Sequence, residues 1–529
     1  MPREDATKGT GALASIGLHF VQACGLFPAS GALAHPEAGA TIEMTDDVDG
    51  GAEMAETKRY LVAGEWRAGT ETFEVTNPYD GSLVAEVASP AEADIEAAVQ
   101  AAHDTFDEAR KLPVHVRAEA LMHISRAIEE RLDEAAELIV REGGKPLKWA
   151  KGEAARAVST FRWAAEEVRR GHDEVMRLDT EAALGSRMGI IRNFPLGPVL
   201  AIAPFNFPIN LVAHKMAPAI AVGAPIVVKP ATKTPLGALF LGELFCETDL
   251  PPGMLSVLPV GGSEAGEMAK DERFAKISFT GSSEVGWGIK RDAPKKAVTL
   301  ELGGNAGVIV HSDADLAHAA KRIAFGGFYQ AGQSCISVQR VLVHEDVSEE
   351  FNGLLAAEVG KLKTGDTMDP DTDVGPVIDH DALERISAWV DEAVQSGAEL
   401  LVGGKREDPC YSPTVLVKTD EDMKVRCEEI FGPVITVGTY SDYEGAIAEV
   451  NNSKYGLQAG VFTSDLDRIM LAHRDIVVGG VIVNDVSSFR ADQMPYGGSK
   501  DSGFGREGLK YAMEEMTEAR ILVLSNIPL

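Results

Sequence analysis

The chain has 529 residues, more than one hydrophobic core usually supports, so we expect two or three domains. Its 81 acidic and 50 basic residues give a formal net charge of -31. This charge disfavours nucleic acid and anionic membranes as partners, because both are bound through cationic surfaces. The acidic excess fits an ordinary solvated surface, and it equally fits work at high salt, where repulsion between like charges is screened.

The five cysteines form no CxxC pair, so the sequence indicates neither a disulfide framework nor a thiolate zinc site. We therefore expect a cytoplasmic protein without a bound metal. Residues 1–57 are predicted to be a disordered or wrongly assigned extension. The apolar stretch at 11–34 is interrupted by polar residues and proline, which argues against a membrane span. A signal peptide cleaved after Ala32-Leu33-Ala34 is the alternative, but no positively charged segment precedes that stretch.

The ordered chain is predicted to open with a strand at 59–66 and a hairpin turn at Asn77-Pro78-Tyr79-Asp80-Gly81. Amphipathic helices follow to about Arg170, and then the apolar period changes to that of strands. The first series of expected strands lies at 189–197, 198–203, 225–229, 254–258, 276–279 and 297–302. The second series lies at 338–344, 399–402, 434–440 and 480–484. Strands that alternate with helices predict an α/β fold with two doubly wound domains.

Three stretches of sequence carry the parts of an acyl-transfer site. Gly332-Gln333-Ser334-Cys335 supplies a thiol, Glu301-Leu302-Gly303-Gly304 a candidate base, and Ala203-Pro204-Phe205-Asn206-Phe207-Pro208 an amide donor for an oxyanion. We expect Cys335 near a helix start, where the helix dipole favours a thiolate. Each residue also has a structural interpretation: a small buried side chain for Cys335, a loop salt bridge for Glu301 and an Asx turn for Asn206.

From about Tyr60 to the C-terminus these motifs resemble the aldehyde dehydrogenase superfamily. The resemblance implies that Cys335 attacks the aldehyde, that Glu301 activates the hydrolytic water, and that Asn206 holds the oxyanion. It also implies that Lys215 lies near the site. The implied layout is a cofactor-binding domain at 58–177 and 195–300, a catalytic domain at 301–505, and a small β oligomerisation arm with a C-terminal segment at 178–194 and 506–529. The apolar strand at 519–525 would pair with a partner subunit in a homodimer or homotetramer.

The cofactor motif lacks the usual GxGxxG and has instead a strand, a glycine turn and a helix start around Gly281. A helix start of this kind binds pyrophosphate through its backbone N–H groups. The resemblance assigns cofactor contacts to Pro204, Phe205, Lys229, Thr232, Thr280, Gly281, Ser282, Leu302, Glu429 and Phe431. NADP is favoured over NAD, because Thr232 stands where many NAD-preferring members carry a glutamate, and Lys233 follows it.

The substrate is predicted to be a small anionic or hydroxylated aldehyde. Arg162 and Arg490 resemble residues that line the substrate tunnel in non-phosphorylating glyceraldehyde-3-phosphate dehydrogenases, although Ser334 stands where that branch carries arginine. The tail motifs look equally like those of lactaldehyde, sulfolactaldehyde and phosphonoacetaldehyde dehydrogenases. Two arginines paired with local acids are the structural alternative. A coenzyme A-acylating enzyme, which typically lacks Glu301, and a catalytically silent binding protein are the alternative functions.

Overall fold

The computed structural model of the protein describes residues 57–171 and 173–527. The expected N-terminal extension, with its apolar stretch at 11–34, lies outside the described residues apart from position 57. Within those two ranges no helix is long and apolar enough to cross a membrane.

The first sheet is built mainly from strands that precede residue 302. Its order is β2 (Glu65–Arg67), β1 (Tyr60–Val62), β9 (Leu255–Val257), β8 (Ile226–Lys229), β7 (Val199–Ile202), β10 (Lys276–Thr280), β11 (Ala297–Glu301) and β23 (Gly503–Phe504). The strands from β9 to β11 run parallel, and antiparallel pairs add β1, β2 and β23 at the two edges. β23 belongs to the stretch expected in the catalytic domain, yet it pairs here, with Gly503 opposite Glu301.

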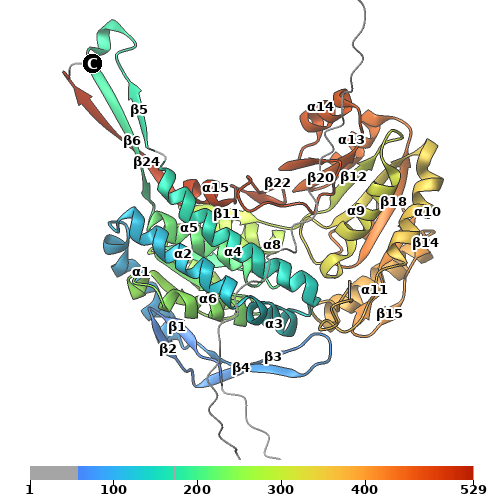
Figure 1. Ribbon diagram of the computed structural model, residues 1–529, viewed down its shortest axis with the longest axis horizontal. Coiled ribbons are helices and arrows are strands. Elements are labelled where there is room, and N and C mark those ends of the chain that lie inside the picture. Colours follow the sequence, from blue (N-terminus) through green and yellow to red (C-terminus); the bar gives the residue numbers. More distant parts are fainter. Residues whose placement is uncertain (1–56, 172, 528–529) are drawn as a thin grey trace, which may run out of the picture. The chain divides into compact units, whose positions relative to one another are not determined.

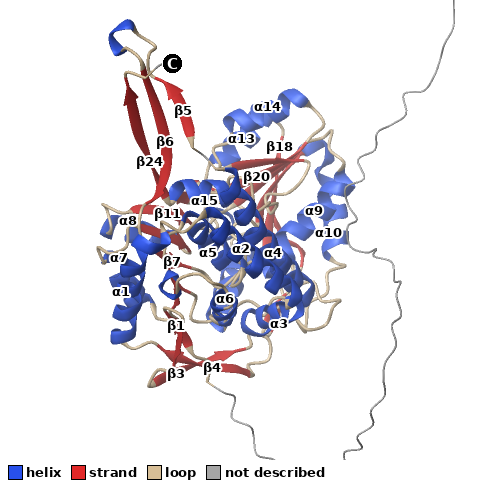
Figure 2. Cartoon of the chain, turned by 60° about the vertical axis from the view of Figure 1, so that its left-hand side comes forward, coloured by secondary structure: helices blue, strands red, loops and turns tan. Residues whose placement is uncertain are grey.

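Helices cover both faces of this sheet. They include α1 (Glu92–Ala109), α2 (Val114–Glu130), α4 (Leu147–Arg170), α5 (Asn210–Val222), α6 (Leu236–Cys246) and α7 (Gly262–Lys270). In β7, Val199 and Ala201 pack in one core with α2, α4, α5 and α6, whereas Leu200 and Ile202 pack in a second core with α1 and α7. Because both faces of such a strand are buried, its residues form a continuous apolar run in the sequence. Figure 2 shows α2, α4 and α5 in front of the strands.

The second sheet carries the later strands. Its order is β14 (Glu399–Val402), β17 (Thr414–Val417), β18 (Val434–Tyr440), β13 (Val338–His344), β12 (Ala306–Val310), β20 (Gln458–Phe462) and β21 (Gly480–Val483). All neighbouring pairs are parallel except β14 with β17. The helices α9 (Leu316–Phe328) and α11 (His380–Gln395) pack on one face, and α13 (Tyr443–Asn451) and α14 (Leu466–Asp475) on the other. The predicted α/β class with two doubly wound sheets is therefore confirmed.

A three-stranded antiparallel ribbon completes the fold. β24 (Thr517–Ser525) pairs along its whole length with β6 (Arg187–Pro195), and β5 (Glu174–Arg177) pairs with the other edge of β6. Figure 1 shows this ribbon extending beyond the helices beside it. The apolar strand predicted at 519–525 thus finds a partner within its own chain, and the pairing was not visible from local sequence.

The predicted site residues lie at the ends of strands from both sheets. Glu301 ends β11 and Thr280 ends β10, both at the carboxyl edge of the first sheet, where doubly wound folds bind ligands. Cys335 and Phe431 come three residues before β13 and β18, at the amino edge of the second sheet. Side chains from the ends of strands in both sheets are therefore brought to one site.

Candidate active site

A cavity of about 980 Å³ holds most of the predicted site residues. Its walls come from both sheets and from α4. The predicted residues that line it are Pro204, Phe205, Asn206, Thr280, Gly281, Ser282, Glu301, Leu302, Cys335, Glu429, Phe431 and Arg490. The predicted residues outside its lining are Arg162, Lys215, Lys229 and Thr232.

Cys335 lies in a tight turn between α9 and β13, and not at a helix start as the sequence predicted. Gln330, Ala331 and Gly332, just before it, all have positive φ, and a Cβ on Gly332 would lie 2.1 Å from the carbonyl oxygen of Gly432. Such backbone is strained for residues other than glycine, so surrounding contacts must hold it. No helix dipole favours the thiolate here, and removal of water by the cavity wall raises the pKa of Cys335 to about 11.

Asn206 is buried beside this turn. Its side-chain Nδ2 donates to the carbonyl oxygen of Gln333 at 3.0 Å, and the Gln330 side chain donates to the Asn206 carbonyl oxygen. Within the described residues the Asn206 Oδ1 atom is buried without a hydrogen-bond partner. The Asn206 amide is thus held by Gln333, two residues before Cys335 in the chain, and Asn206 and Cys335 line the same cavity.

Glu301 is 3% exposed, and neither carboxyl oxygen has a hydrogen-bond partner within the described residues. Burial raises its pKa well above the usual value, and the nearby Glu507 raises it further. An unpaired buried carboxyl with a raised pKa that lines a cavity is the environment expected of a general base. It is not the loop salt bridge of the alternative interpretation.

Lys215 is fully buried behind the cavity wall and makes three hydrogen bonds. Its Nζ donates to Ser278 at 3.0 Å, to Thr280 at 2.7 Å and to the Glu507 carboxylate at 2.9 Å. Burial alone would raise the pKa of Glu507, but Lys215 and Arg490 together lower it to about 2. Lys215 therefore holds the side chains of Thr280 and Glu507 in place beside the cavity. Sequence reasoning did not identify Glu507.

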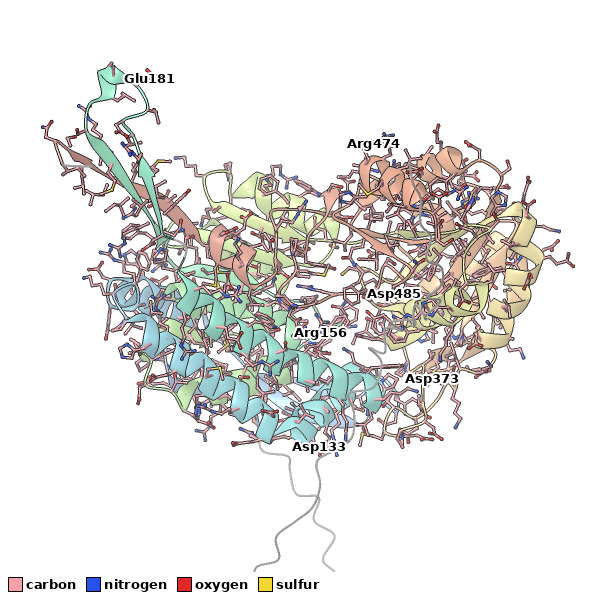
Figure 3. All side chains as sticks on the ribbon, turned by 45° about the horizontal axis from the view of Figure 1, so that its top comes forward. Asp133, Arg156, Glu181, Asp373, Arg474 and Asp485 are labelled. Carbon is pink, nitrogen blue, oxygen red and sulfur yellow. The ribbon has the colours of Figure 1, made fainter. Side chains whose placement is uncertain are left out.

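The two predicted substrate arginines differ in position. Arg490 lines the cavity, with its guanidinium 3.2 Å from Glu507 and 3.7 Å from the centre of the Tyr496 ring. Arg162 is exposed on α4 and does not reach the cavity. Arg156 on the same helix, labelled in Figure 3, does reach it. Its guanidinium donates to Asp492 at 2.8 Å. Arg162 is therefore not part of the cavity in which the sequence placed it, and Arg156 lines the cavity instead.

Helical periodicity explains this correction. The cavity residues of α4 are Trp149, Gly152, Glu153 and Arg156, spaced three or four apart as one helix face requires. Arg162 comes six residues after Arg156, which places it about 120° around the helix. Counting the helical period from Trp149 would have placed Arg156, and not Arg162, on the face toward the cavity.

The other end of the cavity fits a dinucleotide. α8 (Ser283–Asp292) begins directly after Ser282, and the Ser282 side chain makes no capping bond, so it and the first N–H groups remain available to a pyrophosphate. Glu429 accepts from the Gly304 N–H at 2.8 Å, and burial raises its pKa to about 7. The rings of Phe205 and Phe431 meet edge to face at 5.9 Å.

Two predicted cofactor residues lie beyond the cavity lining. Lys229 ends β8 and is half-buried, and burial lowers its pKa. Thr232 is exposed, and the neighbouring Lys233 is paired with Asp379 rather than free. Within the described residues no group of three or more His, Cys, Asp or Glu side chains could hold a metal ion.

The fold and this cavity define an oxidoreductase with a thiol, a buried carboxyl group and a nucleotide crevice. The profile of the aldehyde dehydrogenase family matches residues 66–522. The chain is 44% identical over 475 residues to a 3-sulfolactaldehyde dehydrogenase of Priestia aryabhattai, covering 89% of this chain and 99% of the relative.

Two solved structures extend the comparison. One is aldehyde dehydrogenase 21 of Physcomitrella patens in complex with the reaction product succinate, at 43% identity and a TM-score of 0.88, covering 89% of this chain and 99% of that one. The other is the NADP-dependent glyceraldehyde-3-phosphate dehydrogenase of Bacillus halodurans C-125 with NADP, at 34% identity and a TM-score of 0.86, also covering 89% and 99%. The chain belongs to the aldehyde dehydrogenase family. It catalyses the NAD(P)-dependent oxidation of an aldehyde to a carboxylate.

Proposed function

We propose that the substrate is a small aldehyde with an anionic tail and that NADP is the preferred cofactor. The observation that carries the substrate class is the pair of arginines, Arg156 and Arg490, in the same cavity as Cys335. The Nε atom of Arg490 is buried and has no hydrogen-bond partner within the described residues. A buried charged donor without an acceptor is costly, so an anionic group of the substrate would satisfy it.

Each arginine is held by a carboxylate that leaves donors free. Asp492 accepts from Nε and one terminal nitrogen of Arg156, and Glu507 accepts from one terminal nitrogen of Arg490. A guanidinium has five N–H donors, so each retains some for a ligand. The relatives named for 3-sulfolactaldehyde and complexed with succinate act on or hold acidic molecules, which supports an anionic substrate here.

We propose that Cys335 is the nucleophile. Its thiolate attacks the aldehyde carbon, an S–C bond forms, and the carbonyl π electrons move to oxygen, where the Asn206 amide and the Cys335 N–H stabilise the charge. The oxyanion then re-forms a carbonyl group as the C–H bond breaks, which leaves a thioester on Cys335. The hydride would pass to a bound nicotinamide cofactor, which Thr280, Gly281, Ser282, Glu429 and Phe431 would hold. Glu301 then takes a proton from the water that attacks the thioester, and the thiolate leaves as the carboxylate product forms. Lys215 keeps Glu507 and Thr280 in place.

The cofactor preference follows from Thr232, three residues after Lys229, the lysine that would bind the adenosine ribose. Thr232 brings no carboxylate that would repel a 2′-phosphate, and the relative from Bacillus halodurans was solved with NADP. The pairing of Lys233 with Asp379 removes Lys233 as a ready phosphate ligand, so the proposal depends on Lys229 and Thr232.

We also propose a homo-oligomer that works in the cytoplasm. The ribbon of β5, β6 and β24 exposes the apolar side chains Val175, Ile521, Leu522 and Val523, which a second copy would cover. The four cysteines in the described residues are free, as in a reducing compartment. Light scattering of the full chain and of Leu522→Glu tests the assembly, and an unchanged mass for the variant would argue against this surface.

The experiment for the substrate class is a panel of matched aldehydes that differ only in an anionic or neutral tail, each assayed with NADP and with NAD. We expect the highest kcat/KM for an anionic aldehyde with NADP. Product analysis with and without coenzyme A separates carboxylate formation from acyl transfer. A preference for neutral aldehydes would contradict the proposal and would favour a hydroxyaldehyde such as lactaldehyde.

A further inference from the structure

The Tyr496 hydroxyl lies 3.0 Å from the Cys335 sulfur, although 161 residues separate them in sequence. Tyr496 is 3% exposed, and its ring packs with Ile336 and Leu457. Its backbone is fixed by two hydrogen bonds with Glu507, at 3.0 and 2.6 Å. The phenol is thus held against the sulfur by contacts that do not depend on the hydroxyl itself.

The hydrogen bond runs from the phenol to the sulfur once the thiol is ionised. Burial and the nearby Cys335 raise the pKa of Tyr496 well above its usual value, so the phenol keeps its proton. A protonated hydroxyl beside a thiolate can only donate. The hydrogen bond in turn lowers the pKa of Cys335 and opposes the effect of burial.

The other groups that face the sulfur do not replace this donor. Glu429 and Glu301 are acidic and disfavour a thiolate, whereas Arg490 favours it only through its charge. Tyr329 donates to Ser334 at 2.9 Å, and the Asn206 amide donates to Gln333. Among the side chains that the structure describes, only that of Tyr496 forms a hydrogen bond with the Cys335 Sγ atom.

Arg490 strengthens the phenol as a donor. Its guanidinium carbon is 3.7 Å from the centre of the Tyr496 ring, and Glu507 holds it there at 3.2 Å. A cation over the face of the ring withdraws electron density from the phenol, which makes the O–H more acidic and the bond to a thiolate stronger.

We propose that Tyr496 is a catalytic residue that stabilises the Cys335 thiolate by direct hydrogen bonding. The thiol proton passes to water, the phenol keeps its own proton, and the sulfur electron pair then forms the S–C bond with the aldehyde. The inference deepens the proposed function, because it assumes that Cys335 is the nucleophile. It also explains how a turn without a helix dipole supports a thiolate.

The test is the pH dependence of Cys335 alkylation by iodoacetamide in the full-length protein and in Tyr496→Phe, followed at the Cys335 peptide by mass spectrometry. A hydrogen bond to a charged acceptor is worth about one to two pKa units, so the midpoint should rise by that amount in the variant. A thiolate without the hydrogen bond is also more nucleophilic, with a Brønsted slope of about 0.4–0.5. At about pH 7–9, below both midpoints, alkylation should therefore fall about 3- to 10-fold in the variant.

The sign of this change separates hydrogen bonding from a structural role. A loosened site would let water reach the sulfur, lower its pKa and speed alkylation, and that result, or superimposable profiles, would overturn the proposal. Tyr329→Phe is the matched control, because it removes a cavity hydroxyl that bonds Ser334 and not the sulfur. Its midpoint should stay within a few tenths of a unit, and a shift as large as that of Tyr496→Phe would also overturn the proposal.

A second measurement avoids a folding defect in the Phe variant. Incorporation of 3-fluorotyrosine makes phenols more acidic, and the Cys335 midpoint should then fall rather than rise, while an unchanged midpoint would contradict the proposal. Alkylation needs no aldehyde, so it is independent of the proposed function. If Cys335→Ala still oxidises aldehydes, the proposed function fails, whereas if only the profiles coincide, the role of Tyr496 fails.

Discussion

Removal of the cavity arginines should separate charged from neutral substrates. In Arg490→Ala and Arg156→Ala we expect kcat/KM for an anionic aldehyde to fall, because each guanidinium supplies a charge-assisted hydrogen bond to the tail. Such a bond is worth about 1.5–3 kcal/mol, which corresponds to about 10- to 150-fold in kcat/KM.

The structure ranks the two losses. The Arg490 side chain is 6% exposed and has the unpartnered Nε, so its loss should lie near the upper end of that range. The Arg156 side chain is 31% exposed, and solvent screening should place its loss near the lower end. Arg162→Ala removes an exposed arginine from the same helix and should change neither substrate by more than about twofold.

The assay is kcat/KM for an anionic aldehyde and its neutral isostere in the parent and the three variants. Arg490→Ala also leaves Glu507 paired with Lys215 alone, so a loss common to both aldehydes measures damage to the site. The difference between the two aldehydes measures recognition of the charge. Equal losses on both substrates, or a loss in Arg162→Ala as large as in Arg156→Ala, would refute the assignment.

Further predictions concern the nucleophile, the cofactor and the base. Cys335→Ala should abolish aldehyde oxidation while NADP binding, measured by fluorescence titration, survives, and unchanged turnover would refute its role. Thr232→Glu should shift the ratio of kcat/KM values from NADP toward NAD, because a carboxylate there would repel the 2′-phosphate, and an unaltered ratio would place cofactor choice elsewhere. Hydrolysis of the acyl-enzyme should accelerate as pH rises through the raised pKa of Glu301, because the carboxylate is the active base, and single-turnover rates that are flat across this range would contradict that role.

Much of the fold could be predicted because both faces of the parallel strands are buried. The stretch 198–203 appears as an unbroken apolar run, and the structure has β7 there. The pairing of Gly503 with Glu301, and of β24 with β6, could not be read in this way, since contacts between distant segments leave no local period.

The same distinction between local sequence and long-range contacts applies to the site residues. Cys335, Glu301 and Asn206 lie in short motifs of glycine and proline, so they could be identified from sequence and lie in one cavity. Tyr496 and Glu507 act through contacts between distant segments, and their importance appears only in three dimensions. The helix start expected at Cys335 was wrong because Gln330, Ala331 and Gly332 adopt positive φ and end the preceding helix in a turn.

The central claim is that oxidation proceeds through a thioester on Cys335 that Glu301 helps to hydrolyse. The most direct measurement is rapid mixing of Glu301→Gln with aldehyde and NADP, followed by intact mass and peptide mass spectrometry. We predict a stoichiometric burst of reduced cofactor, slow turnover, and an acyl group on the Cys335 peptide, because acylation proceeds while hydrolysis stalls. Absence of both the burst and the acyl group would contradict this role of Glu301, and an acyl group on any other residue would contradict the assignment of Cys335.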